Sequence, residues 1–155
     1  ITVSTCGIIK GIEKFTAEKE QVNLAISLHA PNDELRKKIM PIAKANKLTD
    51  LMESIKKYIE KTNRRVTFEY IMLSEVNDSE VCAKELSNLL KGINCYVNLI
   101  PYNETENIEY KRTKKEKILN FYDILKKNKI NVTIRKEFGG KVDAACGQLR
   151  ANNNI

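Results

Sequence analysis

Residues 23–29 read Asn-Leu-Ala-Ile-Ser-Leu-His, and this short stretch decides the fold class. Large apolar side chains at Leu24, Ile26 and Leu28 alternate with small or polar ones. Because successive side chains of a β-strand point to opposite faces, the alternation predicts a strand with one apolar face. Ser27 and His29 then lie on the other face.

The rest of the chain switches between two periodicities. Strand-like runs occupy residues 2–6, 65–73, 95–100 and 131–135, and helix-like spacing of apolar residues occupies 51–59, 81–90 and 118–125. A weaker helix is expected over residues 8–19, interrupted by Gly11. Strands that alternate with single amphipathic helices imply right-handed crossovers and a parallel sheet. The sequence therefore predicts one α/β domain over residues 1–155.

Three local signals mark where elements begin or turn. Ser79 is expected to cap the helix over 81–90, because a serine side chain can accept a hydrogen bond from a first-turn N–H group. Thr113 stands three residues before Glu116, which predicts a capping box at the next helix. Gly7 permits a tight turn after the first strand.

Composition indicates a globular protein with an anionic partner. The 155 residues are 42% hydrophobic and 30% charged, and 27 Lys and Arg against 20 Asp and Glu give a formal charge of +7. Basic residues concentrate over 111–117, 126–129 and 135–136. Nucleic acid would suit this charge, although solvated helix faces in a lysine-rich sequence explain it as well.

Cysteine spacing and apolar run lengths exclude several classes of protein. No apolar run approaches the roughly 20 residues that a bilayer crossing needs, so we expect no membrane segment. Cys6, Cys82, Cys95 and Cys146 form no C-x-x-C pair, so no metal site is expected. Reduced thiols and a cytoplasmic location fit this pattern. The chain opens on a strand-like run without an initiator methionine, and we interpret it as a fragment that starts inside a domain.

Polar side chains follow the ends of three of the expected strands. Ser4 ends the first, Ser27 and His29 end the second, and Asn98 and Asn103 bracket the end of another. In parallel α/β folds ligands bind beyond the carboxyl ends of the strands, so we expect one rim that suits a polar ligand. His29 is the only histidine, and an acid–base, a ligand-binding and a structural role are all open. The two serines have no visible base partner and are expected to bind, not to attack.

Two further residues have chemical potential. Cys146 lies among small residues after the last strand, and an accessible thiol becomes a good nucleophile once deprotonated. Cys6, Cys82 and Cys95 lie in strand or helix patterns and are expected to be inert core residues. Glu69 lies in the middle of a strand on the presumed interior face, where a buried pair or a ligand contact is possible and a structural hydrogen bond is favoured.

Four stretches, residues 25–36, 76–79, 98–103 and 143–150, together resemble the RlmN family. Members are radical S-adenosylmethionine (SAM) methyltransferases that act on C2 of an adenine in 23S rRNA and in some tRNAs. The Cfr group, which methylates adenine C8, is the nearest alternative. The run Asp-Ala-Ala-Cys-Gly-Gln-Leu-Arg over residues 143–150 favours the C2 enzyme.

The resemblance implies a fold, a site and an incomplete domain. The fold would be part of a (β/α)6 barrel, holding its strands three to six and an extra terminal strand. The resemblance assigns SAM binding to Ser4, to Ser27, Leu28 and His29, and to Asn103, and it makes Cys146 the carrier of the methyl group. The C-x-x-x-C-x-x-C ligands of the [4Fe–4S] cluster are absent, so residues 1–155 would be an incomplete radical SAM domain without activity of its own.

Two other expectations remain. A basic RNA-binding module without catalysis is the rival from another class, although the chain is only 6% aromatic and has no tryptophan for base stacking. The first strand, residues 2–6, would expose an unpaired edge, so we expect the chain to associate with itself or to be only marginally stable.

Overall fold

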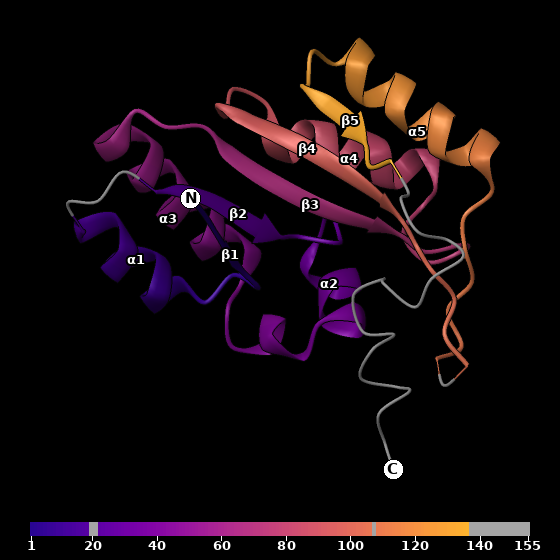
Figure 1. Ribbon diagram of the computed structural model, residues 1–155, viewed down its shortest axis with the longest axis horizontal. Coiled ribbons are helices and arrows are strands. Elements are labelled where there is room, and N and C mark those ends of the chain that lie inside the picture. Colours follow the sequence, from indigo (N-terminus) through magenta and orange to yellow (C-terminus); the bar gives the residue numbers. More distant parts are fainter. Residues whose placement is uncertain (19–21, 107, 137–155) are drawn as a thin grey trace.

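The computed structural model describes residues 1–18, 22–106 and 108–136. Five strands form one sheet in the order β1-β2-β3-β4-β5, and every neighbouring pair is parallel (Figure 1). Their bounds are β1 Thr2–Thr5, β2 Asn23–Ser27, β3 Val66–Met72, β4 Cys95–Pro101 and β5 Val132–Ile134. The α/β class and the extra terminal strand are therefore confirmed.

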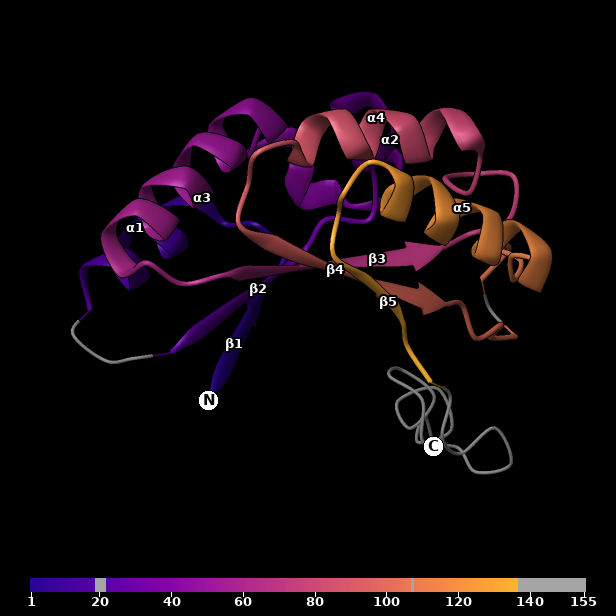
Figure 2. The same cartoon turned by 90° about the horizontal axis from the view of Figure 1, so that it is seen from above.

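The helices lie on one side of the curved sheet, as Figure 2 shows. They are α1 Ile9–Ala17, α2 Asp33–Ile39, α3 Leu48–Thr62, α4 Glu80–Leu90 and α5 Lys115–Lys127, with a 3₁₀ turn over Pro41–Lys44. Helix α1 packs beside α3, and α4 packs beside α5. No helix in the described ranges covers the opposite face of the sheet. Ser4 and Ser27, two of the predicted ligand-binding residues, lie on this uncovered face, near the carboxyl ends of their strands.

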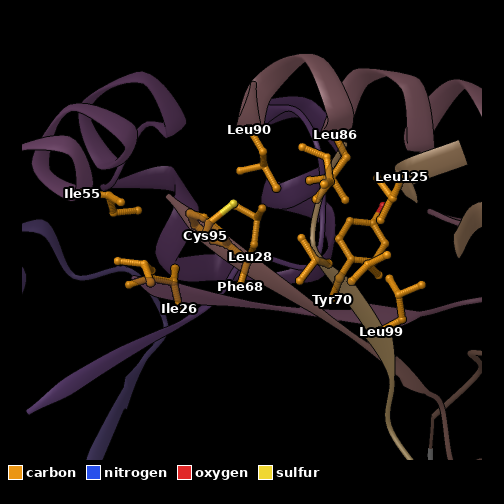
Figure 3. Close-up of a cluster of buried hydrophobic side chains, with 14 of the residues drawn as sticks. Ile26, Leu28, Ile55, Phe68, Tyr70, Leu86, Leu90, Cys95, Leu99 and Leu125 are labelled. Carbon is orange, nitrogen blue, oxygen red and sulfur yellow. The ribbon is translucent and has the colours of Figure 1, made fainter. Parts of the chain in front are cut away.

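The core fills the space between the sheet and the helices. Tyr70 of β3 and Phe68 point toward this layer, where Leu86 of α4 and Leu125 of α5 meet them (Figure 3). Burial along β3 alternates between fully and partly buried residues, as a strand with one helix-covered face requires. The face assigned to Leu24 and Ile26 from the sequence is confirmed, since both are buried.

Helix starts were predicted with mixed success. Ser79 caps α4, because its Oγ accepts a hydrogen bond from the Cys82 N–H at 3.2 Å. The capping box at Thr113 was wrong: Lys114 is the N-cap residue without a side-chain cap, and the buried Thr113 Oγ1 has no partner in the described part of the chain. Gly11 lies inside a continuous α1 and does not interrupt it.

Candidate functional site

The uncovered face of the sheet carries a row of polar residues. Ser27 pairs in register with Glu69, Glu69 with Asn98, and Asn98 with Thr133. Ser4 pairs with Ala25, which lies two residues before Ser27. Since paired residues of parallel strands point to one face, and since i and i+2 share a face, Ser4 and Ser27 both face the uncovered side.

His29 continues this rim beyond the end of β2. Its backbone turns into the left-handed region at φ 59°, and its N–H donates to the Glu69 carbonyl at 3.3 Å. Its ring atom Nδ1 accepts a hydrogen bond from the Ile71 N–H at 3.1 Å. The ring nitrogen thus takes the place of the backbone acceptor that a longer β2 would offer to β3.

The protonation state of His29 follows from this environment. Burial and, to a smaller extent, the charge of Arg36 lower the pKa of the imidazole to about 4, against the opposing effect of a hydrogen bond with the Glu69 backbone. The ring is therefore neutral at neutral pH. Because Nδ1 is the acceptor, the single ring proton is on Nε2, and Nε2–H is a donor.

Arg36 joins the ends of β1 and β2 beneath the rim. The side chain is fully buried, and it donates to the carbonyls of Cys6 at 2.9 Å, Leu28 at 3.3 Å and Asn46 at 3.4 Å. Gly7 makes room for the guanidinium, since a Cβ at that position would lie 2.7 Å from Arg36 Nη2. The turn that follows Ser4 and the turn that carries His29 are therefore held at a fixed spacing.

Asn77 holds the same turn from the other side. It is fully buried, and its Nδ2 donates to the carbonyls of His29 at 2.8 Å and Ile71 at 2.7 Å. Its Oδ1 accepts from the Leu73 N–H at 2.8 Å. Sequence reasoning gave neither Asn77 nor Arg36 a role, although both lie in stretches that resemble the RlmN family.

Asn103 lies at the same edge of the sheet, two residues beyond the end of β4. It is exposed, and no hydrogen bond within the described ranges joins its side chain to Ser4, Ser27 or His29. Its loop is attached to the end of β3, because the Ser74 N–H donates to the Lys111 carbonyl at 2.9 Å. The structure thus brings two serines and the histidine to one rim and leaves Asn103 beside it.

Leu28 and Glu69 have contrasting environments. The Leu28 side chain is fully buried in the core, and its N–H donates to the Glu69 carbonyl at 3.0 Å. The half-buried Glu69 side chain makes no hydrogen bond or ion pair with the residues that the structure describes. The structural hydrogen bond favoured for Glu69 is therefore not found, and its carboxylate can accept hydrogen bonds from a ligand.

The prediction of inert core cysteines is confirmed for two of the three that the structure describes, whereas Cys6 is only partly buried and lies outside the core. Cys82 and Cys95 are buried, and burial raises the pKa of the Cys95 thiol to about 11. Within the described ranges no cluster of three His, Cys, Asp or Glu side chains could hold a metal, so these residues do not fit an iron–sulfur cluster. Cys146 lies outside the described residues. None of the helices described here could cross a membrane.

The basic residues after β4 are partly paired with carboxylates. Lys111 lies 3.8 Å from Glu104, and Lys117 pairs with Glu75 and lies 3.8 Å from Asp78. These pairs are mostly exposed and contribute little stability, so the lysines stay available to a stronger anion.

Comparisons with known proteins give consistent relatives. The chain is 54% identical over 153 residues to a probable dual-specificity RNA methyltransferase RlmN of Spiroplasma citri, and 58% identical over 151 residues to one of Bacillus licheniformis. These matches cover 99% and 97% of the chain but only 44% and 42% of the two relatives. The chain therefore spans less than half the length of these curated relatives. No family model matches it.

Solved structures show the same fold. A radical SAM methyltransferase from Sphaerobacter thermophilus superposes with a TM-score of 0.92 at 44% identity, covering 96% of this chain and 43% of that one. A domain of a pyruvate-formate lyase-activating enzyme from Bacteroides vulgatus superposes with a TM-score of 0.67 at 14% identity, covering 87% of this chain and 80% of that domain. The second likeness concerns the fold alone.

Proposed function

We propose that the chain is the C-terminal portion of an RlmN-type RNA adenine methyltransferase and that it contributes the SAM-binding rim and the methyl-carrying thiol of that enzyme. The observation that carries the proposal is the shared face of Ser4 and Ser27 at the carboxyl edge of a parallel sheet, with His29 fixed beside them. In parallel α/β folds this edge is where ligands bind.

The rim can satisfy a ligand that has both donors and acceptors, as SAM has in its ribose, adenine and amino acid groups. The hydroxyls of Ser4 and Ser27 donate and accept, and the Nε2–H of His29 donates. The Glu69 carboxylate accepts, and the Asn103 amide does both. Leu28 would contribute through its backbone, while its buried side chain anchors this part of the rim in the core. SAM would supply the methyl group, and the [4Fe–4S] cluster of the whole enzyme would need ligands from outside these 155 residues.

Cys146 is proposed as the residue that carries the methyl group before it reaches the adenine. Its small neighbours, Ala144, Ala145 and Gly147, would let a substrate approach the thiol closely. Because no cluster ligands are present, we expect no methyl transfer by the 155-residue chain alone.

The proposed substrates are 23S rRNA and tRNA in the cytoplasm, with adenine C2 as the methylated atom. The net charge of +7 supports an RNA partner. Methylation of C8, as in the Cfr group, is the second candidate, and the Asp-Ala-Ala-Cys sequence that ends at Cys146 favours C2.

Self-association through β1 is part of the proposal for the isolated chain. β1 pairs only with β2 in the described sheet, and Ile1 and Val3 are 97% and 39% exposed. An unpaired strand edge with exposed apolar side chains is a template for another strand. Light scattering that shows only a monomer across a wide concentration range would contradict this.

A chimera tests the proposed activity. Residues 1–155 are joined to the N-terminal portion of the Bacillus licheniformis relative and expressed in a bacterium that lacks its own RlmN-type enzyme. We expect mass spectrometry of 23S rRNA and tRNA to find 2-methyladenosine, and we expect the Cys146→Ala chimera to give none. A chimera that folds and binds SAM but methylates C8, or no RNA at all, would contradict the assignment.

A further inference from the structure

A closed set of hydrogen bonds surrounds the turn after β2. The Ile71 N–H donates to His29 Nδ1, and Asn77 Nδ2 donates to both the Ile71 and the His29 carbonyls. Asn77 Oδ1 accepts from Leu73, and the Asn77 carbonyl accepts from the Tyr70 hydroxyl at 2.7 Å. Asn77 is thereby bonded to the backbone at two strand ends, at His29 and Ile71, which lie 42 residues apart along the chain.

This set of bonds replaces the sheet ladder where β2 ends. The Leu28 N–H donates to the Glu69 carbonyl, so a continued parallel ladder would bring the Ile71 N–H to the Leu28 carbonyl. That carbonyl accepts from Arg36 Nε instead, and His29 turns away at φ 59°. The imidazole accepts that N–H in its place. The left-handed conformation is unfavourable for a residue with a Cβ, so it needs contacts that hold it there.

The neighbours of Asn77 do not share this role. Asp78 Oδ1 accepts from the Glu75 N–H at 3.1 Å, and Ser79 caps α4. Both are local contacts of the turn between β3 and α4. Of these three residues, Asn77 alone reaches the turn after β2 in the described contacts.

We propose that Asn77 is a positioning residue, which holds the His29 backbone in its left-handed turn so that the imidazole keeps Nδ1 on Ile71 and directs Nε2–H to an acceptor atom of the ligand at the rim. The ligand half of this proposal rests on the proposed SAM binding. The positioning half concerns the ligand-free chain and stands or falls without it. The low pKa of His29 is consistent with the arrangement, since a ring held in a buried site resists protonation.

The test uses nuclear magnetic resonance, because the chain has a single histidine and its ring signals need no separation from others. With ¹⁵N-labelled protein, we expect the wild-type ring to be the Nε2–H tautomer with a pKa near 4. In Asn77→Ala we expect a mixture of tautomers and a pKa that moves toward 6.5. If Asn77→Ala does not fold, Asn77→Leu fills the same space without adding a buried charge and also removes the two donations, so it gives the same readout.

Tyr58→Phe is the matched control. Its hydroxyl donates to the Val22 carbonyl at 3.0 Å, at the opposite end of β2 from His29. This variant should lose thermal stability while the tautomer and the pKa of His29 stay as in the wild type. An Asn77 variant that is folded, less stable and unchanged in the tautomer and pKa of His29 would show a merely structural role and overturn the proposal.

Titration with SAM separates this proposal from the proposed function. We expect Asn77→Ala to weaken binding by roughly tenfold, the size of one lost hydrogen bond to the ligand, and we expect Tyr58→Phe to leave binding unchanged. Equal affinity of the wild type and Asn77→Ala would overturn the ligand half. These titrations use the chimera, because the chain alone lacks the cluster ligands. If the chimera with Asn77 intact binds no SAM, the proposed function fails, while the tautomer measurement on the chain still decides whether Asn77 positions His29.

Discussion

The partly buried, neutral imidazole of His29 makes the stability of the chain depend on pH in a calculable way. Its pKa is about 4 in the folded chain and 6.5 in the unfolded chain. Between pH 6.5 and pH 4 the histidine binds a proton in the unfolded chain but stays neutral in the folded chain. The stabilisation is therefore fully present above pH 6.5 and is lost progressively as the pH falls through 4.

The size of the effect follows from the difference between the two pKa values. Between pH 7.5 and pH 5 the free energy of unfolding should fall by about 2 kcal/mol through His29 alone, approaching ~3 kcal/mol below pH 4. Urea denaturation followed by far-ultraviolet circular dichroism, under reducing conditions at several pH values, measures this change.

His29→Asn supplies the comparison. Asparagine tolerates the left-handed backbone, and its Oδ1 can accept the Ile71 N–H as Nδ1 does, but its side chain does not titrate. Carboxylates and the terminal amine contribute equally to both proteins, so the difference between the two curves isolates the imidazole. Parallel curves between pH 7.5 and pH 5 would refute the buried, neutral assignment of His29.

Three substitutions probe the rest of the rim. Gly7→Ala should destabilise the chain by roughly 2–3 kcal/mol in urea denaturation, because a Cβ would meet Arg36 Nη2 in a backbone already at φ +89°. Gly92→Ala is the control: its backbone has a similar φ of +77° but open space around it, so it should cost only ~1 kcal/mol. Equal losses in the two variants would contradict the close approach of Gly7 to Arg36. Arg36→Ala should cost about 3 kcal/mol by leaving buried carbonyls unpaired, and a loss below about 1 kcal/mol would show that its bonds are not needed. Glu69→Gln should leave the urea midpoint unchanged and weaken SAM binding severalfold in calorimetry, while a large loss of stability would reveal a structural partner.

Much of the architecture follows from local patterns in the sequence. The spacing of apolar residues indicates which face of an element is buried. The alternation at Leu24 and Ile26 therefore predicted a strand, and the helical spacing over residues 51–59 predicted a helix. Helix α2, Asp33–Ile39, escaped notice because seven residues are too few for a clear period. Its signal was Asn32, whose side chain caps the helix by accepting from the Leu35 N–H.

The site was accessible from the sequence only in part. The shared face of Ser4 and Ser27 follows from parallel pairing and residue parity. The orientation of His29 does not, because it depends on an N–H group 42 residues later in the chain and on the buried amide of Asn77. The failed capping box at Thr113 has a similar origin: the helix begins after Lys114, and a shift of one residue removes the cap geometry.

We propose that SAM binds on the uncovered face of the sheet, at the carboxyl ends of β1, β2 and β4. A crystal structure of the chimera with its cluster and SAM bound tests it most directly. We expect ligand atoms within hydrogen-bond distance of Ser27 Oγ and His29 Nε2, with the His29 turn unchanged. SAM bound against the helices, or at the amino ends of the strands, would contradict it.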